Sequence, residues 1–144
     1  YKLLQMGRDF KKLLLQDYLD ELCKTVVSSG HVDGILLDIE ICCDIKVDSK
    51  TAINMGLILS ELIVNSLKHA IDGGTLTISI RGELSSDGEI TLVYSDDGKP
   101  YPENFNPKET GSLGLLLISS LVKQLNGRME PDYPNKKISF LIPE

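Results

Sequence analysis

The chain has 144 residues, of which 42% are hydrophobic and 25% are charged, so it is long enough to bury a core as one globular domain. Its formal net charge of −6 argues against nucleic acid as a partner and against direct contact with an anionic membrane. No apolar run reaches the roughly 20 residues that cross a bilayer, and no signal peptide opens the chain. We therefore expect a cytoplasmic domain, alone or as the cytosolic part of a membrane-anchored protein.

The first part of the chain is predicted to hold a connector, a strand and a helix. Residues 1–10 show no hydrophobic period, and we expect them to connect to a segment upstream. Leu13–Leu15 is typical of a short strand. Apolar residues at helical spacing follow Asp17, which is placed to cap a helix that continues to Ser28 and is stopped by Gly30.

Two short strands and a long helix come next. Ile35–Ile41 alternates acidic and apolar residues, and Ile45–Val47 is a second short strand. Asp48 or Ser49 is placed to cap the central helix. We expect that helix to end at the pair Gly73–Gly74, because paired glycines stop a helix.

The last part of the chain is predicted to consist of two hairpins that flank a loop and a helix. Thr75–Leu84 and Glu89–Ser95 have a period of two around a glycine turn and form the first hairpin. Asp96–Gly111 contains three prolines and is longer than an ordinary connection, which favours a functional loop. A helix over Ser112–Asn126 follows, and the second hairpin pairs the last two strands, Arg128–Asp132 and Lys136–Ile142.

These elements amount to three helices and about six strands, and most neighbouring strands are predicted to be antiparallel. Helices and sheets bury their apolar faces against one another in stacked layers. We therefore predict an α/β fold in which residues 1–144 form a single domain. This domain is a two-layer sandwich with about three helices packed on one face of a mixed, mostly antiparallel sheet.

The central helix carries a polar stripe. At about 100° per residue, Glu61, Asn65 and Lys68 fall within a narrow arc, with His69 at its margin. The arc is extended at its ends by two further polar residues, Asn54 and Asp72. Such groups are costly to bury without a partner, and a metal-bound polyphosphate would supply one. Asn offers an oxygen to a divalent cation, Glu can orient or deprotonate a hydroxyl or water, and Lys meets phosphate charge. A surface helix with one solvated face is the alternative.

Two glycine-containing stretches follow the stripe. Asp96–Gly98 stands at the end of a predicted strand, where a carboxylate can accept a hydrogen bond from an exocyclic amine such as that of adenine. An Asx turn would use the same residues. Gly111–Gly114, with the sequence GSLG, opens an apolar helix, where free N–H groups and a close backbone approach suit an anion.

Three motifs, ELIVNSLKHA, DDGKPYPE and GSLGLLLISSLVKQLNG, thus stand in this order along the chain. They resemble the N box and the two glycine boxes of the catalytic, ATP-binding domain of sensor histidine kinases. These kinases belong to the GHKL superfamily, which shares the Bergerat fold. The chain is most similar to the HWE-related branch, whose N box ends in KHA and whose ATP lid, the loop between the two glycine boxes, is short. The similarity runs from about Leu13 to Ile142, nearly the whole chain.

The resemblance implies a Mg²⁺-dependent protein histidine kinase that transfers the γ-phosphoryl group of ATP. It implies that Asn65 binds the Mg²⁺ that bridges the ATP phosphates. Glu61 would be the catalytic residue that helps to activate the accepting imidazole. Lys68 and His69 would lie against the nucleotide, and Asp96 would accept a hydrogen bond from the adenine amine.

The glycine boxes have roles of their own in this resemblance. Gly98 would let the base approach. The second box would wrap the phosphates through Gly111, Ser112, Leu113, Gly114 and Leu115. In one departure from the DxGxG form of the first box, Pro100 occupies the position of the second glycine. Because proline fixes φ and lacks an N–H, we expect the loop to start more stiffly here.

The phosphate-accepting histidine is expected outside this sequence. The two histidines are His31, in a predicted loop after Gly30, and His69, which belongs to the N box. The resemblance therefore implies the histidine-bearing dimerisation segment of the parent kinase as a partner, and a response regulator as an indirect one. An anti-sigma-type serine kinase and a catalytically silent pseudokinase of the same fold are the alternatives.

Overall fold

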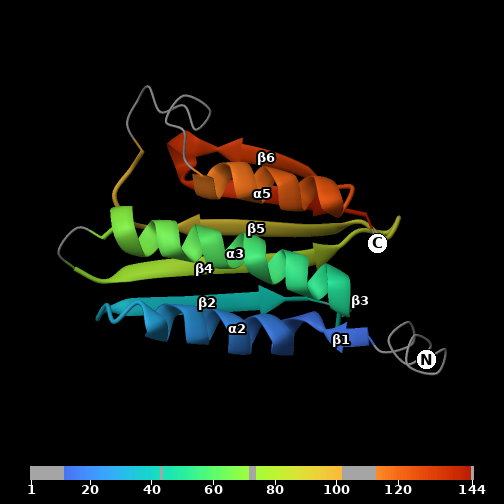
Figure 1. Ribbon diagram of the computed structural model, residues 1–144, viewed down its shortest axis with the longest axis horizontal. Helices are drawn as coiled ribbons and strands as arrows, with labels where there is room; N and C mark the ends of the chain where they lie inside the picture. Colours follow the sequence, from blue (N-terminus) through green and yellow to red (C-terminus); the bar gives the residue numbers. More distant parts are fainter. Residues whose placement is uncertain (1–11, 43, 72–73, 102–112, 144) are drawn as a thin grey trace.

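The computed structural model describes residues 12–42, 44–71, 74–101 and 113–143. Within these ranges, three helices lie on one face of a five-stranded sheet (Figure 1). The helices are α2 (Leu15–Ser29), α3 (Ser49–His69) and α5 (Leu113–Gln124). The strands of the large sheet are β2 (Ile35–Ile41), β4 (Leu76–Leu84), β5 (Ile90–Asp96), β6 (Arg128–Asp132) and β7 (Lys137–Ile142). A small second sheet pairs β1 (Lys12–Leu14) with β3 (Lys46–Asp48). None of the described helices is both long and apolar enough to cross a membrane.

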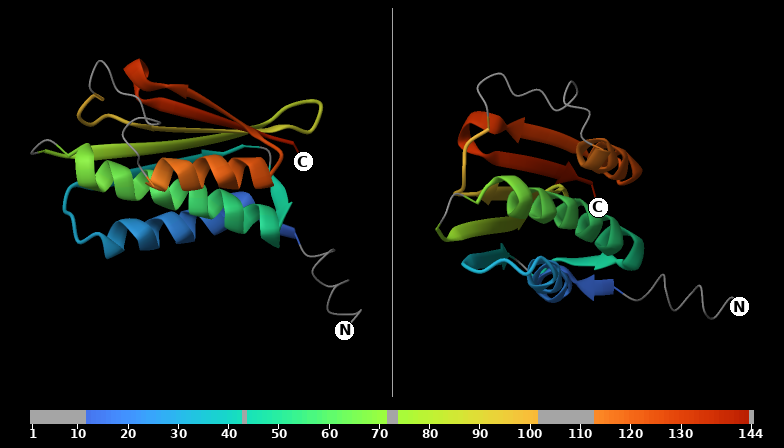
Figure 2. Two further views of the ribbon diagram at one scale, coloured as in Figure 1. Left: turned by 45° about the horizontal axis from the view of Figure 1, so that its top comes forward. Right: turned by 60° about the vertical axis from the view of Figure 1, so that its left-hand side comes forward.

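The five strands stand in the order β2-β4-β5-β7-β6. β2 runs parallel to β4, and the other neighbouring pairs are antiparallel. Figure 2 shows the described helices on the same side of the sheet. The predicted two-layer sandwich with a mixed, mostly antiparallel sheet is therefore confirmed, and so are both predicted hairpins.

Alternation along the strands decides which side chains enter the core. In β4 and β5 every second residue is buried over most of the strand. The fully buried side chains are large and apolar, as with Phe140, Ile78 and Leu92. Burying one such side chain contributes about 2 kcal/mol. Gly56 lets α2 and α3 pack closely, because a Cβ at this position would lie 2.4 Å from Leu22 Cδ2.

The two ends of α3 differ in how well the sequence predicts them. Asp48 caps the helix as predicted, since its Oδ1 accepts a hydrogen bond from the Thr51 N–H at 2.8 Å. This bond lowers the pKa of Asp48. The predicted end at Gly73–Gly74 is wrong, because α3 already stops at His69 and Ala70 is its C-cap residue.

The start of α2 also differs from its prediction. The short strand is β1, one residue earlier than predicted, and the helix begins at Leu15 directly after it. Asp17 is therefore not the cap residue. The N-cap residue is Leu14, and no side-chain hydrogen bond caps the helix. Asp17 lies inside the first turn, where its negative charge still interacts favourably with the helix dipole.

The side chain of Gln16 pairs with the outer edge of β2. Its Oε1 accepts from the Ile41 N–H at 2.7 Å, and its Nε2 donates to the Ile39 carbonyl oxygen at 3.0 Å. β2 stands at the end of the sheet, and the free backbone groups of such a strand attract other chains. The carboxamide thus satisfies two backbone groups that lack a neighbouring strand, and it fixes α2 against the sheet.

Candidate active site

Four segments of the chain meet at one end of the sheet, on the left of Figure 1. β5 ends there at Asp96, α3 ends there at His69, and α5 begins there at Leu113. The turn between β6 and β7 lies at the same end. The fold therefore gathers the N box, the first glycine box and the start of α5, which are far apart in the sequence.

The polar stripe of α3 divides into a half-buried part and an exposed part. Glu61 and Asn65 are half-buried, whereas Lys68 and His69 are exposed. Neither Glu61 nor Asn65 forms a side-chain hydrogen bond or ion pair with any residue that the structure describes. Half-buried polar groups without a protein partner are available to a ligand that supplies one.

The N-terminal end of the stripe is closed. Asn54 is only 8% exposed, and its Nδ2 has no hydrogen-bond partner among the described residues. It lies three turns before Asn65 on the same arc of the helix. Asp72, at the other end of the stripe, lies outside the described residues. The stripe is therefore accessible over its C-terminal half, from Glu61 onwards.

A buried hydrogen-bond network joins the end of β5 to α3. Ser66 Oγ donates to Asp96 Oδ2 at 2.8 Å, and the Tyr94 hydroxyl lies 2.6 Å from the same Oγ. The Tyr94 oxygen also lies 3.1 Å from the carbonyl oxygen of Leu62. Burial raises the pKa of Tyr94 well above its usual range, so the phenol stays protonated as a donor. Because Ser66 directly follows Asn65, the network fixes Asp96 relative to the polar stripe.

The turn after Asp96 packs on the C-terminal end of α3. The Gly98 N–H donates to Asp96 Oδ1 at 2.9 Å, and the Lys99 N–H donates to the Ala70 carbonyl oxygen at 2.8 Å. A Cβ at Gly98 would lie 2.4 Å from that same Ala70 oxygen and 2.7 Å from Leu76 Cδ1. Close packing within the protein therefore requires a glycine here. The approach of a base to Gly98 stays a prediction.

The second glycine box is described only in part. Gly111 and Ser112 lie outside the described residues. Leu113 is the first residue of α5, and Gly114 and Leu115 follow in its first turn. A ligand at this helix start would meet backbone N–H groups without helical partners. The wrapping of phosphates by these five residues stays a prediction.

A cation beside Asp96 was missed by sequence reasoning. Lys136 Nζ lies 3.0 Å from Asp96 Oδ1, and it donates to the Lys99 carbonyl oxygen at 2.8 Å. Lys136 follows the 3-10 turn η1 (Tyr133–Asn135), which connects β6 to β7. A Pro-Asn-Lys-Lys sequence is typical of a solvated turn, so no local pattern pointed to this ion pair.

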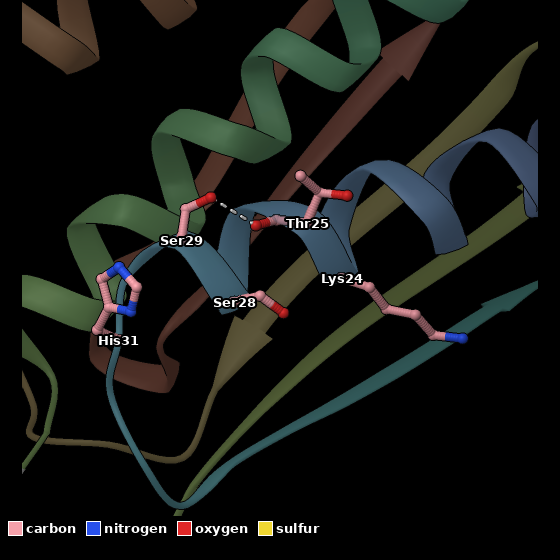
Figure 3. A pocket seen from close by; sticks show the side chains of 5 residues that line it. All are labelled: Lys24, Thr25, Ser28, Ser29 and His31. Carbon is pink, nitrogen blue, oxygen red and sulfur yellow. Dashed lines mark hydrogen bonds between the residues drawn. The ribbon is translucent and has the colours of Figure 1, made fainter.

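A separate hollow lies beside the end of α2 (Figure 3). It has a volume of about 470 Å³ and is lined by Lys24, Thr25, Ser28, Ser29 and His31. The Ser29 hydroxyl donates to the Thr25 carbonyl oxygen at 2.9 Å, within the helix itself. His31 is exposed and has a positive φ of 53°. None of the predicted nucleotide-binding residues lines this hollow.

The metal-binding capacity of the site depends on what a ligand brings. In the part of the chain that the structure describes, no group of three or more His, Cys, Asp and Glu side chains could hold a metal ion. Asn65 nevertheless offers a carboxamide oxygen, and Mg²⁺ prefers oxygen ligands. Mg²⁺ commonly takes its other ligands from water and substrate phosphates. The residues present therefore fit a Mg²⁺ that is bound together with a polyphosphate.

The fold is a two-layer α/β sandwich that brings the C-terminal end of the polar stripe of α3 and the carboxylate at the end of β5 to one end of the sheet. The chain belongs to the family of histidine kinase-like ATPase domains, whose family model matches residues 30–136. Blue-light-activated histidine kinase 2 of Erythrobacter litoralis (strain HTCC2594) is 27% identical over 122 residues, which cover 83% of this chain and 34% of the relative.

Other relatives give the same family. Sensor histidine kinase PdtaS of Mycobacterium tuberculosis (strain CDC 1551 / Oshkosh) is 32% identical over 85 residues, which cover 57% of this chain and 17% of the relative. This chain spans about a third of the length of the first relative and less of the second.

Solved structures share the fold. The histidine kinase domain of the Erythrobacter litoralis EL346 blue-light-activated histidine kinase superposes with a TM-score of 0.80 at 23% identity, over 92% of this chain and 67% of that chain. Full-length ShkA, solved in complex with AMPPNP, gives a TM-score of 0.70 at 16% identity, over 92% of this chain and 30% of that chain. At these identities the likeness establishes the fold.

Proposed function

We propose that this chain is the Mg²⁺-dependent, ATP-binding catalytic domain of a sensor histidine kinase. The proposed reaction is transfer of the γ-phosphoryl group of ATP to a histidine on a separate dimerisation segment. The observation that carries this proposal is the pair of Glu61 and Asn65, which are half-buried one turn apart on α3 and have no side-chain partner among the described residues. The neighbouring Ser66 ties that pair to the carboxylate of Asp96. The names of the relatives and the AMPPNP complex of ShkA support it.

Each end of the nucleotide has a candidate partner in this proposal. Asp96 accepts a hydrogen bond from the adenine amine, since its carboxylate is fixed by Ser66 and by the Gly98 N–H. Asn65 holds Mg²⁺, which neutralises phosphate charge when bound. The phosphates are held by the exposed pair Lys68 and His69 and by the second glycine box, Gly111, Ser112, Leu113, Gly114 and Leu115.

Glu61 acts on the accepting imidazole. Its carboxylate accepts the proton of one ring nitrogen while the other nitrogen attacks the γ-phosphorus. The new N–P bond forms as the bond between the γ-phosphorus and its bridging oxygen breaks, and ADP leaves. Positioning supplies most of the acceleration in such a transfer, because the attacking nitrogen must stand in line with the leaving oxygen.

The accepting histidine is supplied in trans. His69 belongs to the last turn of α3, and His31 stands beside the separate hollow at the end of α2. Neither is free to swing onto a nucleotide held by α3 itself. The partner is therefore the dimerisation segment of the parent kinase, in the cytoplasm, and a response regulator receives the phosphoryl group afterwards.

Binding of ATP by the purified chain tests the first step of this proposal. In a calorimetric titration we expect ATP to bind with Mg²⁺ present and to bind much more weakly in excess EDTA, because Asn65 contacts the phosphates through the metal. GTP is expected to bind poorly, because it presents an oxygen instead of an amine to Asp96. No binding of ATP in either buffer would contradict the proposed function, and equal binding in both would contradict the role of the metal.

A further inference from the structure

The ammonium of Lys136 is held in a fixed place beside Asp96. Its Nζ lies 3.0 Å from Asp96 Oδ1 and 2.8 Å from the Lys99 carbonyl oxygen. The side chains of Lys136 and Asp96 are 10% and 3% exposed. Lysine has a long, flexible side chain that is rarely buried, so this confinement is unusual. The low exposure also makes an unmatched polar group at this place costly for a ligand.

A pair of tyrosine rings holds the ammonium on one side, through the ring of Tyr101. Lys136 Nζ lies 4.4 Å from the centre of the Tyr101 ring, a distance at which a cation is attracted by the aromatic face. The Tyr101 and Tyr133 rings meet edge to face at 5.5 Å between their centres. Burial, together with the negative charge of Asp96, raises the pKa of Tyr101 to about 12. The rings therefore stay neutral and keep the cation in position.

The hydrogen-bonding capacity of the ion pair is not used up. Ser66, Gly98 and Lys136 donate to the Asp96 carboxylate, which has about four acceptor positions. Lys136 has three N–H donors, of which Asp96 and the Lys99 carbonyl oxygen take two. Gly98 and Lys136 both contact Oδ1, so among the described residues the remaining acceptor position of Asp96 is on Oδ2. One N–H of Lys136 likewise has no hydrogen-bond acceptor in the described part of the chain.

We propose that Lys136 is a specificity-determining residue, which donates a hydrogen bond to N1 of adenine while Asp96 accepts one from the adjacent exocyclic amine. This inference rests on the proposed function, in which Asp96 pairs with that amine. The edge of adenine presents a donor, the amine, next to an acceptor, N1. An acceptor on the protein beside a donor matches this order directly.

The same pair rejects guanine. Guanine presents an oxygen at the position of the amine and an N–H at position 1. Its acceptor would therefore face the acceptor Asp96, and its donor would face the donor Lys136. A site built to hydrogen-bond a ligand rejects an analogue strongly when buried polar groups are left without partners. Lys136 thereby adds a second point of contact to the one that the first glycine box supplies.

The competing explanation is that Lys136 only neutralises Asp96 and holds the turn between β6 and β7. The analogue 1-deaza-ATP separates the two explanations. It keeps the exocyclic amine and replaces N1 by a carbon, so it loses the contact with Lys136 and keeps that with Asp96. A structural role of Lys136 affects both nucleotides equally, whereas a direct contact affects ATP alone.

The test is calorimetry of the chain, in the presence of Mg²⁺, with ATP and with 1-deaza-ATP. The wild type should bind ATP about 10-fold more tightly than 1-deaza-ATP, the size expected for one hydrogen bond to a charged group. Lys136→Met should weaken the binding of ATP about 10-fold and leave the affinity for 1-deaza-ATP nearly unchanged. Lys137→Met, at the exposed neighbouring lysine, is the matched control and should bind both nucleotides as the wild type does.

Three results would overturn the inference. They are equal affinity of the wild type for the two nucleotides, equal weakening of both by Lys136→Met, and tighter binding of ATP by that variant. The first comparison needs no substitution, so it decides the matter even if Lys136→Met fails to fold. A wild type that binds neither nucleotide would instead contradict the proposed function, which separates the two failures.

Discussion

Replacing Asn65 by alanine is expected to weaken Mg²⁺-dependent binding of ATP about 100-fold, the upper range for disturbing a metal site. Asn65 is half-buried on α3 and its side chain has no partner among the described residues, so its carboxamide oxygen is free to bind the metal. Calorimetry with ATP and Mg²⁺ measures the change. The fold should persist, because removing this side chain breaks no hydrogen bond with any described part of the protein.

Two controls make the Asn65 result specific. In excess EDTA, Asn65→Ala and the wild type should bind ATP equally weakly, since the lost contact runs through the metal. Lys50→Ala changes an exposed residue at the opposite end of the same helix and should leave the affinity unchanged. An unaltered affinity in Asn65→Ala, alongside an unaltered melting curve, would exclude the proposed metal ligand.

Replacing Glu61 by glutamine should separate binding from transfer. Glutamine keeps the size of the side chain and its hydrogen bonding, but it cannot accept the proton of the imidazole. General base catalysis is typically worth about 10²- to 10⁴-fold, so we expect the rate of phosphoryl transfer to fall by at least about 100-fold. The affinity for ATP with Mg²⁺ should change little, because Asn65 and Asp96 are untouched.

The measurement for Glu61→Gln is single-turnover transfer to the dimerisation segment at saturating ATP. Saturation removes any small effect on binding, so the rate reports the chemical step. Ser60→Ala, one position earlier on α3, is the matched control and should transfer at the wild-type rate. A Glu61→Gln variant that transfers as fast as the wild type would remove Glu61 from the reaction.

The sequence predicts those parts of the site that lie on elements with a clear helical or strand periodicity. The stripe of Glu61, Asn65 and Lys68 is visible because polar residues recur at helical spacing on an otherwise apolar helix. The position of Asp96 is visible because an alternating strand ends there next to a glycine. The layered fold follows for the same reason, since strand and helix periods are both clear along most of the chain.

The parts that the sequence cannot predict depend on distant pairing. Tyr94 alternates inward like any core residue of a strand, and nothing local shows that its hydroxyl meets Ser66. Lys136 stands in a turn where lysines are usually solvated, and its ion pair with Asp96 arises only when β7 pairs beside β5. Local sequence likewise does not reveal that β2 pairs in parallel with β4.

The wrong predictions of the start of α2 and the end of α3 have a simpler cause. Capping signals compete, and several residues near a boundary can serve. Leu15 enters α2 directly from the strand pairing of β1, ahead of the better cap at Asp17. At the end of α3, the Lys99 N–H donates a hydrogen bond to the Ala70 carbonyl oxygen. A contact across the fold therefore satisfies this helix end before the glycines are reached.

The measurement that tests the central proposal most directly is transfer of radiolabelled phosphate from ATP to the histidine-bearing dimerisation segment of the same kinase, mixed with this chain and Mg²⁺. We expect acid-labile label on the segment, no label on this chain alone, and no label on a segment whose histidine is replaced by glutamine. A chain that binds ATP with Mg²⁺ but leaves the wild-type segment unlabelled would contradict the account and indicate a catalytically silent domain. Acid-labile label on the chain alone that disappears in His31→Ala would contradict it as well, because the acceptor would then lie within the chain.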